Sequence, residues 1–118
     1  MPWELDSDRP IYAQIVDRLK HEIVSGFYPP GSRLPSVRDL AAQASVNPNT
    51  MQKAFTELER TGLIVTRRTS GRTVTEDTAL IEQVRSELAE LQISQFLTRM
   101  QHLGYQKDDS IRLLLAKK

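Results

Sequence analysis

The sequence predicts a mainly α-helical chain with one small β-hairpin, organised as an N-terminal domain at residues 1–76 and a helical arm at residues 77–118. Three observations support this prediction. Apolar residues recur every three to four positions through most of the chain, which is the period of an amphipathic helix. Two β-rich runs around a glycine, at residues 62–75, interrupt that pattern. An excess of basic residues ends at about the same place.

The composition is that of a soluble globular protein, with 39% apolar and 26% charged residues. No apolar run approaches the roughly 18 residues that a membrane-spanning helix needs, so we expect no membrane partner. The N-terminal stretch MPWELDSDRP lacks the apolar core of a signal peptide, so we expect a cytoplasmic protein. The sequence has no cysteine, which excludes disulfides and thiolate metal sites.

A first helix is expected from Pro10 to just before Gly26. Proline is favoured at the first position of a helix, because the N–H that it lacks would have had no partner there. The apolar stripe of this helix comprises Ile11, Ile15, Val16, Leu19 and Ile23. The run YPPGSRLP follows, and its three prolines predict an extended or turning segment.

Two further helices follow, with about three residues (ASV) between them. Ser36 can cap the first of these helices, and Asp39 completes a capping-box pattern. If Asn47 caps the second helix, Pro48 becomes its first residue, where a proline is tolerated. Gly62 closes this helix, whose inward stripe comprises Met51, Ala54, Phe55 and Leu58. Two capped helices joined by a tight turn form a helix-turn-helix pattern.

The run GLIVTRRTSGRTVT predicts a β-hairpin with a three-residue turn, TSG, that contains Gly71. The tip of this hairpin carries Arg67, Arg68 and Arg72. A helix-turn-helix followed directly by a basic hairpin is a winged helix. In that arrangement the second helix of the pair enters the major groove of DNA, and the hairpin can meet the flanking backbone or minor groove. Both pieces present cations where phosphates would lie.

The distribution of charge agrees with this prediction. Residues 33–72 carry seven basic and three acidic residues, a net charge of +4, in a chain whose net charge is +1. Such a stretch is typical of a nucleic-acid footprint, although a solvated charged surface would give the same count. Arg38 is more informative, because a cation in the first turn of a helix opposes the helix macrodipole. An external anion would explain its presence there.

The chain from PIYAQI to the hairpin resembles the GntR family of bacterial transcription regulators. The matching pieces are PIYAQI, IxSGxxxPGxRLPSVRDLA, VxxxTxxKAxxELExTGLI and RxxxGxxV, in that order between residues 10 and 74. The short helical tail resembles the YtrA-like branch, whose members have two C-terminal helices in place of a large effector domain. The resemblance implies a DNA-binding dimer that usually represses, often beside genes for ATP-binding-cassette transporters. It therefore implies a repressor of a transporter-type operon.

On the matching positions, the resemblance implies DNA-facing roles for residues in both helices of the pair and in the wing: Arg38, Asn47, Asn49, Thr50, Gln52, Arg68 and Gly71. The basic pattern adds three more candidates: Lys53, Arg67 and Arg72. Simple structural explanations also exist for several of these residues. Asn47 can be only a helix cap, Thr50 can bond only the helix start, and the wing arginines can form a solvated turn.

The arm has six acidic and six basic residues, so it does not look like part of a DNA face. Its long helix, which should end at Gly104, carries one apolar stripe and then a second, offset one. Two helices this apolar cannot bury themselves in about 40 residues, so they pack either on their own winged domain or on a second copy of the chain. We favour a symmetric homodimer, which predicts a palindromic DNA operator with half-sites about one helical turn apart. The residues expected at its interface are Ile81, Val84, Leu88, Leu91, Phe96, Leu97 and Met100.

Other classes of function have little support in the sequence. We find no Ser-His-Asp set, no phosphate-binding loop and no paired carboxylates in a recognisable frame, so we expect no enzyme and no catalytic residues. Neither His21 nor His102 has a second ligand at metal-binding spacing, so we expect no metal and no cofactor. A small-molecule effector could lodge at the dimer interface, but nothing in the sequence identifies one. The main alternative is a winged-helix protein–protein assembly module without DNA binding.

Two positions depart from the family pattern and lead to a prediction. Pro48 stands where the family often has arginine, and Gln52 where it often has arginine or lysine; the wing also reads TSG where the family usually has GSG. Asparagine and glutamine pair well with adenine, whereas arginine favours guanine, so we predict an operator richer in A·T than is typical for the family. Selection of binding sites from random DNA checks this prediction. A selected site with G·C at every contacted base pair would contradict it.

Overall fold

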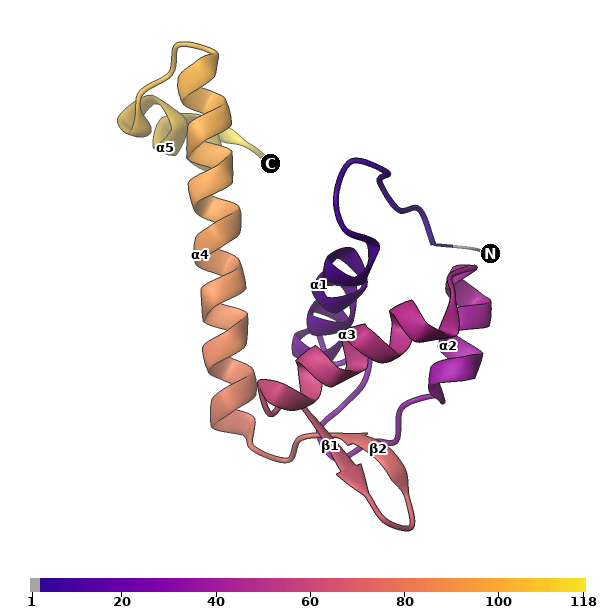
Figure 1. The fold of residues 1–118 in the computed structure, drawn as a ribbon. Helices are drawn as coiled ribbons and strands as arrows, with labels where there is room; N and C mark the ends of the chain where they lie inside the picture. The colour runs from indigo at the N-terminus through magenta and orange to yellow at the C-terminus, as the bar shows by residue number, and fades with distance from the viewer. Residues whose placement is uncertain (1–2) are drawn as a thin grey trace. The chain divides into compact units, whose positions relative to one another are not determined.

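The computed structural model describes residues 3–118. The chain divides into two compact units, Met1–Val84 and Arg85–Lys118. The described residues form five helices and one two-stranded antiparallel sheet (Figure 1), as the sequence predicts. The first unit holds most of the elements in the order α1 (Ile11–Val24), α2 (Val37–Ala44), α3 (Pro48–Arg60), β1 (Ile64–Arg67) and β2 (Gly71–Val74). After these come α4 (Thr78–His102), which begins in the first unit and continues into the second, and α5 (Lys107–Ala116).

The core of the first unit forms around α3, which packs against α1, α2 and β1. The four residues of its predicted inward stripe are all 0% exposed: Met51, Ala54, Phe55 and Leu58. The stripe of α1 is buried against them, with Ile15 and Leu19 also at 0% exposure. Burial of these apolar faces supplies the main driving force for folding the unit.

Ser36 and Asn47 cap the N-termini of α2 and α3 as the sequence predicts, and of the capping box expected at α2 the bond to Ser36 is seen. The N–H of Asp39 donates to the Oγ of Ser36 at 3.0 Å, and the N–H of Asn49 donates to the Oδ1 of Asn47 at 2.7 Å. Pro48 is the first residue of α3, so its missing N–H removes no helical hydrogen bond. The turn between the helices needs one left-handed residue, which is Ser45 with a φ of 58°. One boundary differs from expectation: α1 begins at Ile11 with Pro10 as its N-cap.

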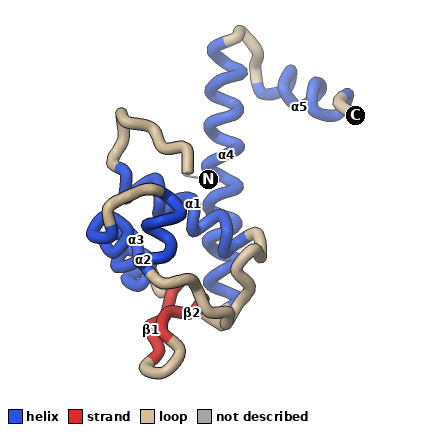
Figure 2. Tube along the Cα trace, turned by 90° about the vertical axis from the view of Figure 1, so that its right-hand side faces the viewer, coloured by secondary structure: helices blue, strands red, loops and turns tan. Residues whose placement is uncertain are grey.

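The hairpin of β1 and β2 is the wing (Figure 2, red), and its register runs from Ile64 opposite Val74 to Arg67 opposite Gly71. The expected turn TSG is displaced by one residue, because Gly71 pairs with Arg67 as the first residue of β2. Its φ of 72° is one that glycine adopts without strain.

The outer edge of β2 is covered by the segment that the sequence predicted only as extended or turning. The N–H of Leu34 donates to the carbonyl of Arg72 at 2.9 Å, and the N–H of Val74 donates to the carbonyl of Ser32 at 2.9 Å. The short pairing leaves the wing with a protected edge and ties it to the loop that precedes α2.

The first turns of α4 belong to the first unit, so the units divide later than the boundary expected after residue 76. Ile81 and Val84, both expected at a dimer interface, belong to this unit, and Ile81 is buried there with 4% exposure. In the second unit, Leu91 is 52% exposed, Phe96, Leu97 and Met100 are half-buried, and α5 starts with a capping box between Gln106 and Asp109. Within residues 3–118, no helix combines the length and apolarity that crossing a bilayer requires.

The buried stripe of α3 yields a prediction about stability. Replacing Met51 with alanine removes a fully buried side chain, which should lower the free energy of unfolding by about 2–5 kcal/mol. Gln43→Ala, on the exposed side of α2, should change it by no more than about 0.5 kcal/mol. Urea unfolding followed by circular dichroism measures both. Equal effects of the two substitutions would contradict the packing described above.

Candidate nucleic-acid interface

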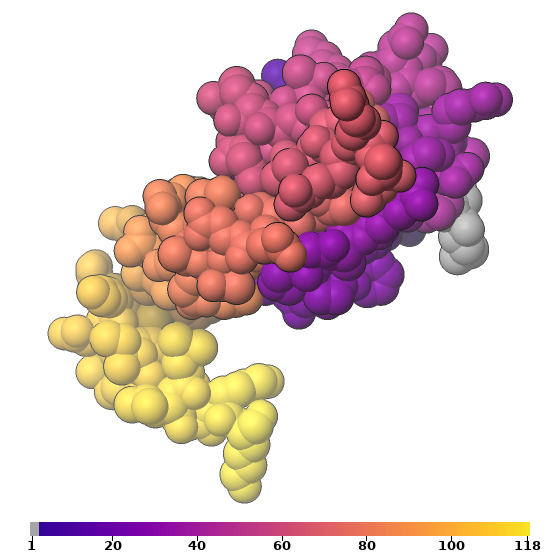
Figure 3. Space-filling view, turned by 90° about the horizontal axis from the view of Figure 1, so that it is seen from below, coloured from indigo at the N-terminus to yellow at the C-terminus, as the bar shows by residue number. Residues whose placement is uncertain are grey.

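The outward face of α3 is polar and accessible. Because the apolar stripe fixes the rotation of the helix, Asn47, Asn49, Gln52 and Lys53 are all exposed on the other side. Thr50 lies between the two faces and is half-buried. The wing lies beside this helix and is seen from below in Figure 3, so the two elements that were predicted to meet DNA lie next to each other.

Two of the predicted cations are free to meet an anion. Arg38, in the first turn of α2, and Arg68, in the turn of the wing, are exposed and have no ion-pair partner within residues 3–118. Arg67 is half-exposed, and its Nη2 lies 3.7 Å from the Oε2 of Glu76, a long contact between two exposed groups. Such exposed pairs contribute little free energy, so Arg67 can exchange its partner for a phosphate at small cost.

Several predicted site residues also have structural roles. Asn47 caps α3, and the Nζ of Lys53 lies 4.0 Å from the ring centroid of Tyr12 on α1, a cation–π contact. Thr50 lines a shallow cleft together with Trp3 and Leu5 of the N-terminal segment. Asn47 and Lys53 therefore help to hold the polar face in place whether or not they also touch DNA.

Arg72 differs from the other wing arginines because its side chain turns inward and is only 28% exposed. Its Nε donates to the Oε1 of Glu59 at 2.7 Å, and the Oγ1 of Thr66 donates to the Oε2 of the same carboxylate at 2.9 Å. Desolvation tends to raise the pKa of Glu59. The hydrogen bonds from Arg72 and Thr66 outweigh it and lower that pKa below the ordinary glutamate value. Glu59 is therefore ionised and paired at neutral pH.

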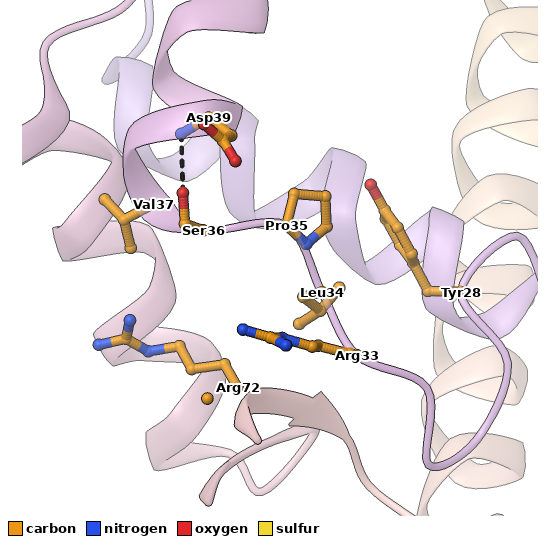
Figure 4. A pocket seen from close by; sticks show the side chains of 9 residues that line it. Tyr28, Arg33, Leu34, Pro35, Ser36, Val37, Asp39 and Arg72 are labelled. Atoms are coloured by element: carbon orange, nitrogen blue, oxygen red, sulfur yellow. Dashed lines mark hydrogen bonds between the residues drawn. The ribbon is translucent and has the colours of Figure 1, made fainter. Parts of the chain in front are cut away.

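A second cationic feature lies between β2 and the start of α2. There, Arg33 and Arg72 line an open cleft of about 520 Å³ (Figure 4) together with Tyr28, Ser36 and Asp39. A Cβ on Gly71 would lie 3.8 Å from the Nε and Nη2 of Arg33, so the Arg33 guanidinium passes close to the wing.

Neither Arg33 nor Glu59 is expected as a site residue from the sequence pattern. The available signal was weak: Arg33 was one of seven basic residues in its stretch, and Glu59 was one of the acids that reduced the net charge. The segment described by the structure, residues 3–118, also contains no group of three histidine, cysteine, aspartate or glutamate side chains placed to hold a metal ion.

Comparison with known proteins shows which family the chain belongs to. Residues 11–74, from α1 to the end of the wing, match the family described as "Bacterial regulatory proteins, gntR family". The chain belongs to the GntR family. It is thus a DNA-binding transcriptional regulator and not an enzyme, and the resemblance seen in the sequence is confirmed.

Relatives of similar length support this assignment. The transcriptional repressor YtrA of Bacillus subtilis is 40% identical over 100 residues, which cover 83% of this chain and 76% of YtrA. A GntR family transcriptional regulator from Listeria monocytogenes is similar over 97% of this chain and all of its own, with a TM-score of 0.86 and 40% identity. The similarity to both proteins extends beyond the winged domain into the helical arm.

A second similar structure contains an operator. The DNA-binding domain of AraR, in complex with operator ORX1, is 26% identical, with a TM-score of 0.54, over 64% of this chain and 92% of its own. The alternative of an assembly module without DNA binding therefore has no support in the comparisons.

Proposed function

We propose that this GntR regulator is a homodimeric repressor that binds a palindromic operator through α3 and the wing. The observation that carries the proposal is the arrangement on one face of the first unit. Gln52, in the second turn of α3, contacts Arg72 of the wing, and the tip of the wing carries the exposed Arg67 and Arg68. Polar side chains suit base edges in the major groove, and exposed arginines suit the flanking phosphates.

Three of the predicted site residues have specific parts in this complex. Asn49 and Gln52 project from the first turns of α3, where a recognition helix contacts base edges. Arg38 projects from the first turn of α2, which crosses the DNA backbone in this class of motif, so its guanidinium supplies the phosphate contact that offsets its unfavourable place in the helix dipole.

The second unit supplies the dimer interface. Its helices expose several large apolar side chains in the isolated chain, among them Leu91 at 52% and Leu115 at 82%. A second copy of the same surface would cover them in a symmetric pair. Two α3 helices related by a two-fold axis fit half-sites about 34–36 Å apart, which is one turn of DNA.

The repressor role follows from the similarity to YtrA, which is a transcriptional repressor. A dimer on its operator excludes polymerase from the same stretch of DNA. We place this action in the bacterial cytoplasm, where operators lie, and we favour a transporter-type operon as its target. A small molecule that bound between the two arms would change the spacing of the α3 helices and so release the operator.

The role of Arg38 can be tested by titrating the DNA upstream of the protein's own operon against scrambled DNA at two salt concentrations. We expect a preference of about 10³-fold or more for the operon DNA. Arg38→Ala should weaken operator binding and make it less sensitive to salt, because one phosphate contact is lost in each subunit. Lys117→Ala, which removes a cation far along the chain at the C-terminal end of α5, is the control and should change neither quantity. Unchanged binding by Arg38→Ala would contradict this assignment.

The dimer can be tested by sedimentation of the free protein. The wild-type chain of 13.5 kDa should sediment as a particle of twice that mass. Leu91→Asp places a charge among the exposed apolar residues and should shift the population to monomers, because burying an unpaired carboxylate is costly. Ser86→Asp, at an exposed polar position on another face of the same helix, serves as the control. Monomeric wild-type protein would contradict the proposal.

A further inference from the structure

One carboxylate of α3 holds both strands of the wing. Thr66 of β1 and Arg72 of β2 stand directly opposite each other in the register, and the two oxygens of Glu59 accept one hydrogen bond from each side chain. Glu59 lies in the last turn of α3. The contact therefore fixes the wing to the helix at a cross-strand pair close to the tip.

The same arginine also reaches the base-reading part of α3. The Nη2 of Arg72 donates to the Oε1 of Gln52 at 3.4 Å, and the guanidinium carbon lies 5.3 Å from the ring centroid of Phe55. Gln52 and Glu59 are two helical turns apart on one face of α3, so the planar guanidinium spans both turns.

These contacts orient the amide of Gln52. Its Oε1 faces Arg72, and its Nε2 donates to the Oγ1 of Thr56 at 3.3 Å. A glutamine amide has two lone pairs and two N–H groups, so one acceptor and one donor remain for a base edge. That remaining pair is the one that adenine N6 and N7 require.

We propose that Arg72 is a positioning residue: it joins the wing to α3 and holds the amide of Gln52 in one orientation, and it does not neutralise a phosphate. This inference rests on the proposed function of α3 as the base-reading helix. The charge of Arg72 is already offset by Glu59. Moving the Arg72 guanidinium to a phosphate would leave the half-buried carboxylate of Glu59 without its ion-pair partner. The lowered pKa of Glu59 agrees with a pair that persists at neutral pH.

The salt dependence of binding separates the two roles of an arginine. Sites are first selected from random duplex DNA with the wild-type chain. Binding of the selected site, and of versions with single base-pair changes, is then measured by fluorescence anisotropy at several salt concentrations. A lost phosphate contact lowers the slope of log K against log salt by about 0.9 for each contact. Arg68→Gln, at the exposed tip of the wing, is the matched control and should show this decrease.

We expect Arg72→Gln to leave the slope unchanged and to lose discrimination at the base pair that Gln52 reads, by roughly 5- to 100-fold. Arg72→Lys should lose the same discrimination, because an ammonium cannot span Glu59 and Gln52, although a lysine would serve well at a phosphate. Glu59→Gln removes no cation and should also lose discrimination. Thermal melts of each variant report on folding, and Glu59→Gln tests the inference even if Arg72→Gln fails to fold.

The inference would be overturned if Arg72→Gln lowered the salt slope as much as Arg68→Gln does and left base discrimination intact. In that case Arg72→Lys would also restore the wild-type slope. Failure of the proposed function looks different, because the wild-type chain itself would then select no site and show no salt-dependent binding.

Discussion

Burial of one side of α3 is the constraint on which the rest of the interface depends. Met51, Ala54, Phe55 and Leu58 are fully enclosed at i, i+3, i+4 and i+7, and an α-helix with that stripe inward has only one rotation about its axis. The apolar core therefore decides which polar side chains face outward. The same core also holds α3 against β1, so the contacts between the helix and the wing follow from the same packing.

The start of α3 uses the same residues for folding and for its outward chemistry. The side-chain oxygen of Asn47 accepts the N–H of Asn49, and the side-chain NH₂ of Asn47 stays available as a donor. Pro48 occupies the one helical position where a proline is harmless, and it removes both an N–H and the cation that the family often has there. The N–H groups of Asn49 and Thr50 are both bonded to Asn47, and the dipole of the helix still gives this end a partial positive charge.

Periodic patterns and local caps made much of this fold predictable from the sequence. The stripe of α3 and the caps at Ser36 and Asn47 depend on residues within a few positions of each other, and the wing is one hairpin around a short turn. The parts that were missed depend on pairings across longer distances. The segment before α2 carries no periodicity that could indicate its pairing with β2, and Glu59 meets Arg72 across 13 positions. Ile81 has the spacing of an arm residue, but it is buried by tertiary contacts in the first unit.

The charge of residues 33–72 has a different meaning once the ion pairs are known. The sequence count treats all seven cations alike, but Glu57 pairs with Arg60 and Glu59 pairs with Arg72. Both acids lie in the last turns of α3, and the first turn contains none. These two pairs leave Arg33, Arg38, Lys53 and the arginines at the tip of the wing, and our proposal assigns phosphates to Arg38 and to the tip of the wing. The helix itself presents amides, whose value for reading bases depends on orientation and not on charge. Arg72 is already neutralised by Glu59 and holds the amide of Gln52 in place. This fits a division in which the exposed arginines attract phosphates and the amides of α3 read the bases.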